Sequence, residues 1–383
     1  MKIAGTKWLE DAAPVMAMLS SNGHRGLAVG GCVRNEIFGE PIADVDIATD
    51  ALPEAVMALA EKEGFRAIPT GIEHGTVTVI CRGRSYEITT FRKDVETDGR
   101  RAVVAFSKDI LEDAQRRDFT FNALYIQADG EVIDPLGGLE DAKSRRLRFI
   151  ENAFERIAED SLRILRYFRF YAQYCDPMDG PDMEAIAAIS ASLDGLEGLS
   201  AERIGAEMRK LLAAADPSPA LALMSQTGVL ARVLPGADAK FIGPLVVLEN
   251  NQPVRWLRRL ATLGGESPAT RWRLSKSEAK DLANIFAAMS LPSLSEAGYR
   301  LGASAALDAL LVQCASIGIP ADPGVIDIIE SAAQEVFPLK APYLMDRIPP
   351  GKALGVELKR LEKLWIDSGF SLSATALDKM VKP

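Results

Sequence analysis

Short runs of alternating apolar and polar residues occupy the chain between about residues 26 and 135 and predict an α/β region. The Arg82-Gly83-Arg84 segment between two such runs predicts a hairpin with a glycine-containing turn. The expected strands are Leu27–Gly30, Val45–Thr49, Phe65–Ile68, Thr76–Cys81 and Ser85–Phe91. The expected helices between them are Val33–Phe38, Pro53–Glu63 and Asp109–Gln115.

The pattern changes after Asp134-Pro135-Leu136-Gly137-Gly138, where helical periodicity takes over. The expected helices are Ala153–Tyr174, Ala201–Ala215, Ala220–Val229, Trp256–Leu263 and Lys276–Met289. Because 383 residues exceed what one hydrophobic core usually supports, several domains are expected. We predict an α+β fold with a mixed-sheet head over residues 1–148, a helical neck over 149–215, and a helical body and tail over 216–383.

Composition narrows the possible functions. Hydrophobic residues make up 48% of the chain, yet no apolar run approaches the roughly 18 residues of a membrane span, and no membrane or protein partner is expected. The N-terminal residues lack a signal-peptide pattern, so we expect a cytoplasmic protein. Four scattered cysteines and two histidines argue against structural zinc and a His-rich metal centre. The net charge of −9 disfavours non-specific nucleic-acid binding, so local basic clusters matter more.

A glycine pair and two aspartates stand close together in the sequence, on predicted strands joined by a short helix. Gly30-Gly31 lets backbone amides approach a phosphate at a helix N-terminus, and Arg34 supplies a guanidinium group to the same anion. Asp44 and Asp46 are expected side by side on one face of a strand, where their carboxylates can hold Mg²⁺ for two-metal-ion phosphoryl transfer. The alternative, a tight turn followed by capping aspartates, explains neither the alternation nor Arg34.

Glu87 alternates with Thr89 and Phe91, so it can lie on an adjacent strand and complete a three-carboxylate set. The alternative is an ordinary exposed strand residue. The following polar stretch, from Arg92 through Asp94 to Arg101, is predicted to be a loop that either closes over a substrate or is simply mobile.

Arg116 and Arg117 follow a predicted helix and suit a triphosphate, because bidentate arginine–phosphate contacts are strong and orienting. A solvated charge pair is the alternative. Asp118 and Asn122 of the same segment, and Arg166 further along, are additional candidates for nucleotide contacts.

Asp160 and Arg163 are neighbours at i,i+3 in a predicted helix. An intrahelical salt bridge is one interpretation. The other is a protein template for a base, because a carboxylate beside a guanidinium group complements the donor–acceptor edge shared by cytosine and adenine, and not that of guanine or uracil. Such a site can reject mismatched bases by about 10⁴–10⁵.

Clusters of basic residues are candidates for RNA phosphate contacts, although charge runs are more often solvated faces. They are Lys143, Arg145, Arg146 and Arg148; Arg203, Arg209 and Lys210; and Arg255, Arg258 and Arg259. Of these, Arg203, Arg209 and Lys210 are the predicted RNA-binding residues.

Taken together, these segments resemble the class II tRNA nucleotidyltransferases (CCA-adding enzymes) and the related bacterial poly(A) polymerases, of the polymerase β-like superfamily. The resemblance covers about residues 26 to 212. It rests on the ordered motifs GGCVRN, DVDIAT, EITTFR, RRDFTFNA, DPLGG, EDSLRILRYFRF and SAERIGAEMRKL. Two positions depart from the family pattern: Asn35, where many relatives carry Asp, and Arg101, where His is common.

The resemblance implies an active-site head, a neck with the base-reading residues, and helical modules that grip the tRNA acceptor arm. It assigns Asp44 and Asp46 to metal, the glycine pair with Arg34 to the triphosphate, and Asp160 with Arg163 to the base. The expected activity is addition or repair of the tRNA 3′-terminal CCA from CTP and ATP with Mg²⁺. The alternatives are a poly(A) polymerase, a partial enzyme adding only CC or only A, and a catalytically silent RNA-binding protein.

Overall fold

The computed structural model describes residues 1–3, 5–97, 102–249 and 252–382. By its internal contacts the chain divides into two compact units. The first combines Met1–Leu211 with Leu223–Val233, and the second combines Leu212–Ala222 with Leu234–Pro383. The division into head, neck, and body with tail remains a prediction.

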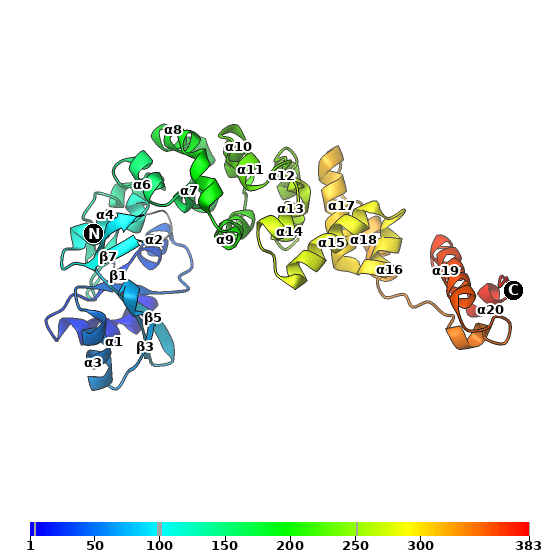
Figure 1. The fold of residues 1–383 in the computed structure, drawn as a ribbon, viewed down its shortest axis with the longest axis horizontal. Helices are drawn as coiled ribbons and strands as arrows, with labels where there is room; N and C mark the ends of the chain where they lie inside the picture. The colour runs from blue at the N-terminus through cyan, green and yellow to red at the C-terminus, as the bar shows by residue number, and fades with distance from the viewer. Residues whose placement is uncertain (4, 98–101, 250–251, 383) are drawn as a thin grey trace. The chain divides into compact units, whose positions relative to one another are not determined.

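A seven-stranded sheet forms the centre of the N-terminal part of the first unit (Figure 1). Its strands, in spatial order, are β3 (Arg66–Gly71), β4 (Thr76–Cys81), β5 (Arg84–Thr90), β2 (Asp46–Thr49), β1 (Leu27–Val29), β8 (Tyr125–Ile126) and β9 (Val132–Ile133). The sheet is mixed because β2 pairs with β5 in parallel, whereas β1 pairs with β2 and β4 with β5 in antiparallel fashion. The mixed sheet and the helical remainder confirm the predicted α+β class.

Apolar side chains bury one surface of this sheet. Ile47 and Ile88 of the central strands are completely buried, as are Val77 and Val79 of β4. The accompanying helices are α1 (Lys7–Ser20), α2 (Gly31–Phe38), α3 (Pro53–Lys62), α4 (Ile110–Gln115) and α5 (Leu139–Lys143). Helices α1 and α3 contact each other and β4, while α2 contacts β1 and α5 (Figure 1). The glycine corner between β1 and α2 is thus held by the core of the sheet.

The predicted polar loop after Glu87 is partly wrong. Residues Arg92–Thr97 form β6, which pairs with β7 (Ala102–Phe106) as a separate two-stranded sheet. Residues 98–101, the end of the predicted loop, lie outside the described residues. The expected strands of the main sheet are confirmed, with ends that differ from the prediction by up to three residues.

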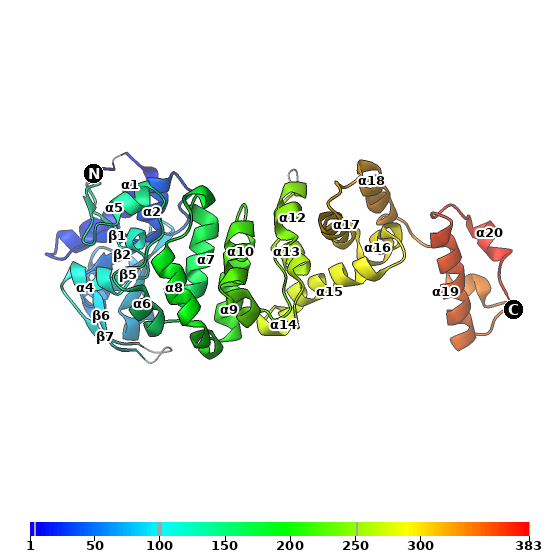
Figure 2. The ribbon, with the colours of Figure 1, turned by 90° about the horizontal axis from the view of Figure 1, so that it is seen from above.

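The single helix expected over Ala153–Tyr174 is instead two helices, α6 (Ala153–Glu159) and α7 (Leu162–Tyr174). Asp160 between them is extended, with φ −153° and ψ 102°. Its side-chain Oδ1 accepts a hydrogen bond from the Leu162 backbone N–H, which is how a short acidic side chain competes with the helix backbone. Figure 2 shows α6 and α7 beside α8 (Met183–Ala191). The break places Asp160 at a turn rather than on a helix face.

The remaining helices of the first unit are α9 (Ala201–Leu212) and α11 (Val229–Val233), with the 3₁₀ segment η4 (Leu193–Gly198) between α8 and α9. Helix α10 (Ser218–Gln226) carries residues of both units. The helices predicted from Ala201 and Ala220 are confirmed with different ends, and the second of them is interrupted before α11.

The second unit is helical throughout its described residues. Its helices are α12 (Ile242–Leu248), α13 (Trp256–Leu263), α14 (Pro268–Arg271), α15 (Lys276–Ser290), α16 (Leu294–Leu301), α17 (Ala303–Ile317), α18 (Pro323–Ala332), α19 (Lys352–Asp367) and α20 (Ala374–Asp378). Helices α15 to α18 pack around small side chains such as Ala297 and Ala306, and α19 and α20 share a cluster around Trp365. In the described chain, no helix has both the length and the apolar character to cross a bilayer.

Candidate active site

Gly30 makes the corner between β1 and α2. Its φ of 73° lies in the left-handed region that favours glycine, and a Cβ there would stand 3.4 Å from Nη1 of Arg117. The following residues begin an eight-residue helix, whose N-terminus carries partial positive charge. Arg117 and the start of α2 therefore bring two sources of positive potential to the same corner.

The register of the sheet places acidic residues beside this corner. Asp46 is the cross-strand partner of Val29, the residue directly before Gly30, and it is also the parallel partner of Glu87 on β5. This confirms that Glu87 lies on a strand next to Asp46. Strand β2 begins only at Asp46, so Asp44 belongs to the segment before the strand and not, as expected, to the strand itself.

The pKa of Asp46 depends on its burial and on the neighbouring charged side chains. Asp44 and Asp46 are both exposed, yet enough protein surrounds the Asp46 carboxyl group to remove part of its hydration. This desolvation and the nearby charges of Glu87 and Asp44 raise the pKa of Asp46, against the opposing effect of Arg117. A carboxylate in this position is stabilised by any cation that reaches it.

The carboxylates suit a metal ion whose remaining ligands are water molecules and substrate phosphates. In the part of the chain that the structure describes, no three Asp, Glu, His or Cys side chains converge closely enough to hold a metal ion by themselves, and the part of Glu87 in a three-carboxylate set remains a prediction. Mg²⁺ is usually bound through one or two carboxylates together with waters and substrate phosphates. Asp44 and Asp46 match that donor set, and their role as metal ligands remains a prediction.

Arg116 and Arg117 share one carboxylate that the sequence analysis missed. Asp113 on α4 is 1% exposed, and its two oxygens accept from Nη2 of Arg116 at 2.6 Å and from Nη2 of Arg117 at 3.0 Å. Tyr125 donates to the same carboxylate from 2.7 Å. The arginine pair is therefore not a freely solvated charge pair, and Arg117 is fixed with one end at Asp113 and the other at the glycine corner.

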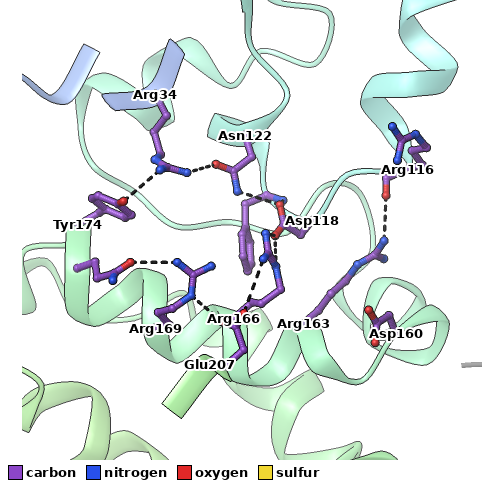
Figure 3. A network of polar contacts seen from close by, with 12 residues as sticks. Arg34, Arg116, Asp118, Asn122, Asp160, Arg163, Arg166, Arg169, Tyr174 and Glu207 are labelled. Carbon is purple, nitrogen blue, oxygen red and sulfur yellow. Dashed lines mark hydrogen bonds and ion pairs between the residues drawn. The ribbon is translucent and has the colours of Figure 1, made fainter. Parts of the chain in front are cut away.

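A chain of polar contacts runs from Arg34 to helix α7 (Figure 3). Arg34 Nη1 donates to Oδ1 of Asn122 at 2.7 Å, and Asn122 Nδ2 donates to Oδ1 of Asp118 at 2.9 Å. Asp118 Oδ2 then accepts from Nε of Arg166 at 2.7 Å. The structure thus brings together four residues predicted to contact the nucleotide and links the glycine corner to the neck.

The same network continues to residues outside the prediction. Glu207 of α9, 6% exposed, accepts from Nε of Arg169 at 2.5 Å and lies 4.0 Å from Nη1 of Arg166. Tyr174 contacts Arg34 in two ways. Its ring centre lies 4.5 Å from the Arg34 guanidinium carbon, and its hydroxyl oxygen accepts a hydrogen bond from Nη2 of Arg34 at 3.0 Å. Arg169 follows Arg166 by three residues on α7, and this i,i+3 spacing was the available signal for Arg169.

Asp160 and Arg163 do not pair with each other, so the intrahelical salt bridge considered from the sequence is wrong. Asp160 Oδ2 accepts from Nη2 of Arg203 at 2.7 Å. Arg163 instead contacts Glu159 at 2.5 Å and donates from Nη2 to the backbone oxygen of Arg116 at 2.9 Å. Both side chains are visible at the edge of the network in Figure 3. Their role as base readers remains a prediction.

The basic clusters separate into different environments. Arg258 and Arg259 are 2% and 1% exposed and form ion pairs with buried carboxylates, so they are structural and not surface RNA contacts. Lys210 is exposed and Arg209 half-buried on α9, and both remain predicted RNA contacts. Arg148 pairs with Asp141 at 2.7 Å.

Two family models match the chain at the segments just described. One, described as "Poly A polymerase head domain", matches residues 27–148, which hold the glycine corner, the acidic residues and the arginine pair. The other, "Probable RNA and SrmB- binding site of polymerase A", matches residues 181–241. The head-domain model thus matches the part of the chain that holds the candidate active site.

Alignments with curated relatives identify the family of the whole chain. A CCA-adding enzyme of Geobacillus kaustophilus is 35% identical over 334 residues, 82% of this chain and 80% of that one. A CCA-adding enzyme of Oceanobacillus iheyensis is 49% identical over 157 residues, a segment spanning 40% of this chain and only 38% of the relative's length. The chain belongs to the family of CCA-adding enzymes.

The likeness extends to three dimensions. The crystal structure of the Bacillus stearothermophilus CCA-adding enzyme in complex with CTP superposes with a TM-score of 0.77 at 27% identity. The superposition covers 95% of this chain and 94% of that one.

Proposed function

We propose that this protein is a template-independent nucleotidyltransferase that adds or repairs the 3′-terminal CCA of tRNA from CTP and ATP, with release of pyrophosphate. Membership of the CCA-adding family supports the activity, and the CTP in the B. stearothermophilus structure supports the nucleotide. The tRNA substrate follows from the motif resemblance. The cytoplasmic location likewise stays a prediction.

One observation carries the proposal. Asp46 is in register with Val29 and with Glu87, so an acidic residue with a second beside it stands next to the glycine corner where a triphosphate would be received. An acidic cation site and an anion-binding corner at the same place are what transfer of a nucleotide from its triphosphate requires. A silent RNA-binding protein has no need for this juxtaposition.

Asp44 and Asp46 would hold Mg²⁺, which supplies charge neutralisation at the α-phosphate and favours ionisation of the attacking 3′-hydroxyl. The backbone N–H groups at the start of α2 bind the triphosphate, assisted by Arg117 beside Gly30. Arg34 is held at this corner through Asn122. Catalysis then rests mainly on positioning and on stabilisation of charge at the transferring phosphate.

We assign base selection to Asp160, at the α6–α7 break, and to Arg163 in the first turn of α7. Arg163 donates to the backbone oxygens of Arg116 and Arg156 at 2.9 Å each, so its guanidinium group is fixed relative to the arginine pair. A fixed donor beside an acceptor complements cytosine and adenine. Recognition of the wrong base would leave polar groups opposed or unpaired, which costs affinity.

The product pattern tests the proposal and separates it from a poly(A) polymerase and from partial enzymes. Transcripts of tRNA that end before CCA, after C, and after CC are incubated with CTP, ATP or both, and products are resolved at single-nucleotide length. We expect C, C and A to be added in order, with synthesis stopping at CCA. Long A tails, or addition of only CC or only A, would support the corresponding alternative.

A further inference from the structure

Arg203 holds the carboxylate that the proposed function assigns to base reading. Its Nη2 lies 2.7 Å from Asp160 Oδ2, while Asp160 Oδ1 accepts from the Leu162 backbone N–H at 3.1 Å. One hydrogen bond on each oxygen fixes the plane of the carboxylate. A carboxylate oxygen has two acceptor positions, so each oxygen keeps one for a ligand.

The ion-pair partner of Asp160 is Arg203 on helix α9, and not Arg163 as the i,i+3 spacing suggests. Arg203 stands on α9, more than forty positions along the chain, whereas Arg163, three residues away, is occupied by Glu159. Two separate pairs, Asp160 with Arg203 and Arg163 with Glu159, therefore hold the acceptor and the donor of the proposed template independently. Loss of Arg203 would release the acceptor and leave the donor in place.

The segment before Arg203 also supports the break that carries Asp160. Gly195 of η4 packs so closely on Ser161 that a Cβ at Gly195 would lie 2.2 Å from the Ser161 hydroxyl oxygen. The turn after Asp160 is thereby pressed against η4, and the arginine that follows on α9 reaches its carboxylate. The η4–α9 segment thus contacts two consecutive residues of the break, Ser161 through Gly195 and Asp160 through Arg203.

We propose that Arg203 is a positioning residue for base selection, which acts by orienting the Asp160 carboxylate toward the exocyclic amine of cytosine or adenine. This inference deepens the proposed function and rests on it. It replaces the expectation that Arg203 contacts RNA phosphates. Side-chain exposures of 38% for Arg203 and 31% for Asp160 leave the pair accessible to a bound nucleotide.

The test measures kcat/KM for CTP, ATP and UTP on tRNA ending before the relevant position, for the wild type, Arg203→Met and Arg203→Lys. Because misplacement of a recognition group by about 1 Å can cost 10²-fold, we expect Arg203→Met to lower the CTP-to-UTP ratio by about 10- to 100-fold. Arg203→Lys keeps a charged donor and should restore part of that ratio. Triphosphate binding should change little.

A double-mutant cycle shows whether Arg203 acts through Asp160. If it does, Arg203→Met added to Asp160→Asn changes the ratio little further, because the carboxylate it orients is already gone. Independent, additive losses in the two variants would overturn the inference. So would a normal CTP-to-UTP ratio in Arg203→Met.

Arg232 of α11 offers a matched control because it forms ion pairs with η4. Its side chain is 42% exposed and pairs with Asp194 and Glu197, so Arg232→Met removes a comparable ion pair without touching Asp160. Its base selection should match the wild type.

Binding of tRNA as a function of salt gives a second readout. If Arg203→Met weakens tRNA binding and reduces the salt slope by about one while selection is normal, Arg203 is an RNA contact and the inference fails. If the wild-type protein adds neither C nor A, the proposed function is refuted. That result is distinct from failure of the inference, because it is seen without any variant.

Discussion

The carboxylate of Asp113 fixes the guanidinium group of Arg117, with Oδ2 and Nη2 3.0 Å apart in a nearly solvent-free setting. Burial by itself would raise the pKa of Asp113. The charges of Arg117 and Arg116 and the Tyr125 hydroxyl outweigh burial and lower the pKa to about 2. The residue that positions Arg117 at the glycine corner is thus also a source of acid-sensitive stability.

Stability should fall in acid as Asp113 becomes protonated. A folded pKa of about 2, against an ordinary value of 3.8, means that the stabilisation is fully present above about pH 5 and is lost as the pH falls toward 2. The loss attributable to this group is about 2 kcal/mol in the free energy of unfolding. Urea unfolding at a series of pH values measures it.

Asp113→Asn provides the comparison for that titration. Because it removes the charge of a buried carboxylate that pairs with two half-buried arginines, it should cost about 3–5 kcal/mol at neutral pH. Its stability should then depend less on pH between 5 and 2 than that of the wild type. An acid transition of the same size in both proteins would contradict the assignment to Asp113.

Asn122→Ala should weaken both the fold and nucleotide binding. Asn122 bridges Arg34 and Asp118, so its removal leaves a buried donor and a buried acceptor without this partner, at about 1–3 kcal/mol. We expect KM for CTP and ATP to rise more than kcat falls, because Arg34 loses its anchor. Thermal unfolding and steady-state kinetics measure the two effects.

A second asparagine is a suitable control for this variant. Asn22, at the end of α1, donates to the Met18 carbonyl oxygen away from the nucleotide site. Asn22→Ala should change stability by less than about 1 kcal/mol and leave KM unchanged. Equal KM values for Asn122→Ala and the wild type would show that the polar chain does not support the site.

Arg259→Met should destabilise the second unit rather than act on RNA directly. Arg259 pairs with Glu249 at 2.8 Å and donates to the Leu212 carbonyl oxygen at 2.7 Å. Removing it takes one of two arginine partners, Arg258 being the other, from the buried Glu249 carboxylate, and breaking such a buried pair costs about 3–5 kcal/mol. Denaturant unfolding tests this, with Lys210→Met as the contrast.

Lys210 is exposed on α9, so its variant should keep wild-type stability. If it contacts RNA, as predicted, the salt slope of tRNA binding should decrease by about one. A stable, fully folded Arg259→Met protein with only reduced RNA affinity would restore the surface interpretation of that cluster.

Local patterns in the sequence predicted the strands of the main sheet well. The alternation of apolar residues in Thr76–Cys81 yields strand bounds identical to the observed ones. The alternation of Glu87 with Thr89 and Phe91 correctly predicted that Glu87 lies on a strand adjacent to that of Asp46. Strand pairing decided where the acidic residues meet the glycine corner. The register of Asp46 with Val29 depends on residues distant in sequence, and no local pattern specifies it.

The errors arise where tertiary contacts override a local pattern. Helical periodicity continues through Asp160, so the sequence does not reveal the break between α6 and α7. The contacts that hold the break come from Gly195 and Arg203, which are distant in the sequence. Arg258 and Arg259 looked like a solvated basic run, yet each is paired with a carboxylate from another helix or loop. Burial of paired charges leaves little trace in the sequence.

Single-turnover CMP addition to tRNA lacking CCA, in the presence of MgCl₂, tests the acidic pair most directly. Asp44→Asn and Asp46→Asn are compared with Asp50→Asn, at the other end of the Asp46 strand, where the carboxylate accepts from the Arg25 backbone N–H. We predict that the first two variants fold normally and lose at least about 10³-fold in rate, and that Asp50→Asn keeps its rate. Rates near that of the wild type in both Asp44→Asn and Asp46→Asn would contradict the account.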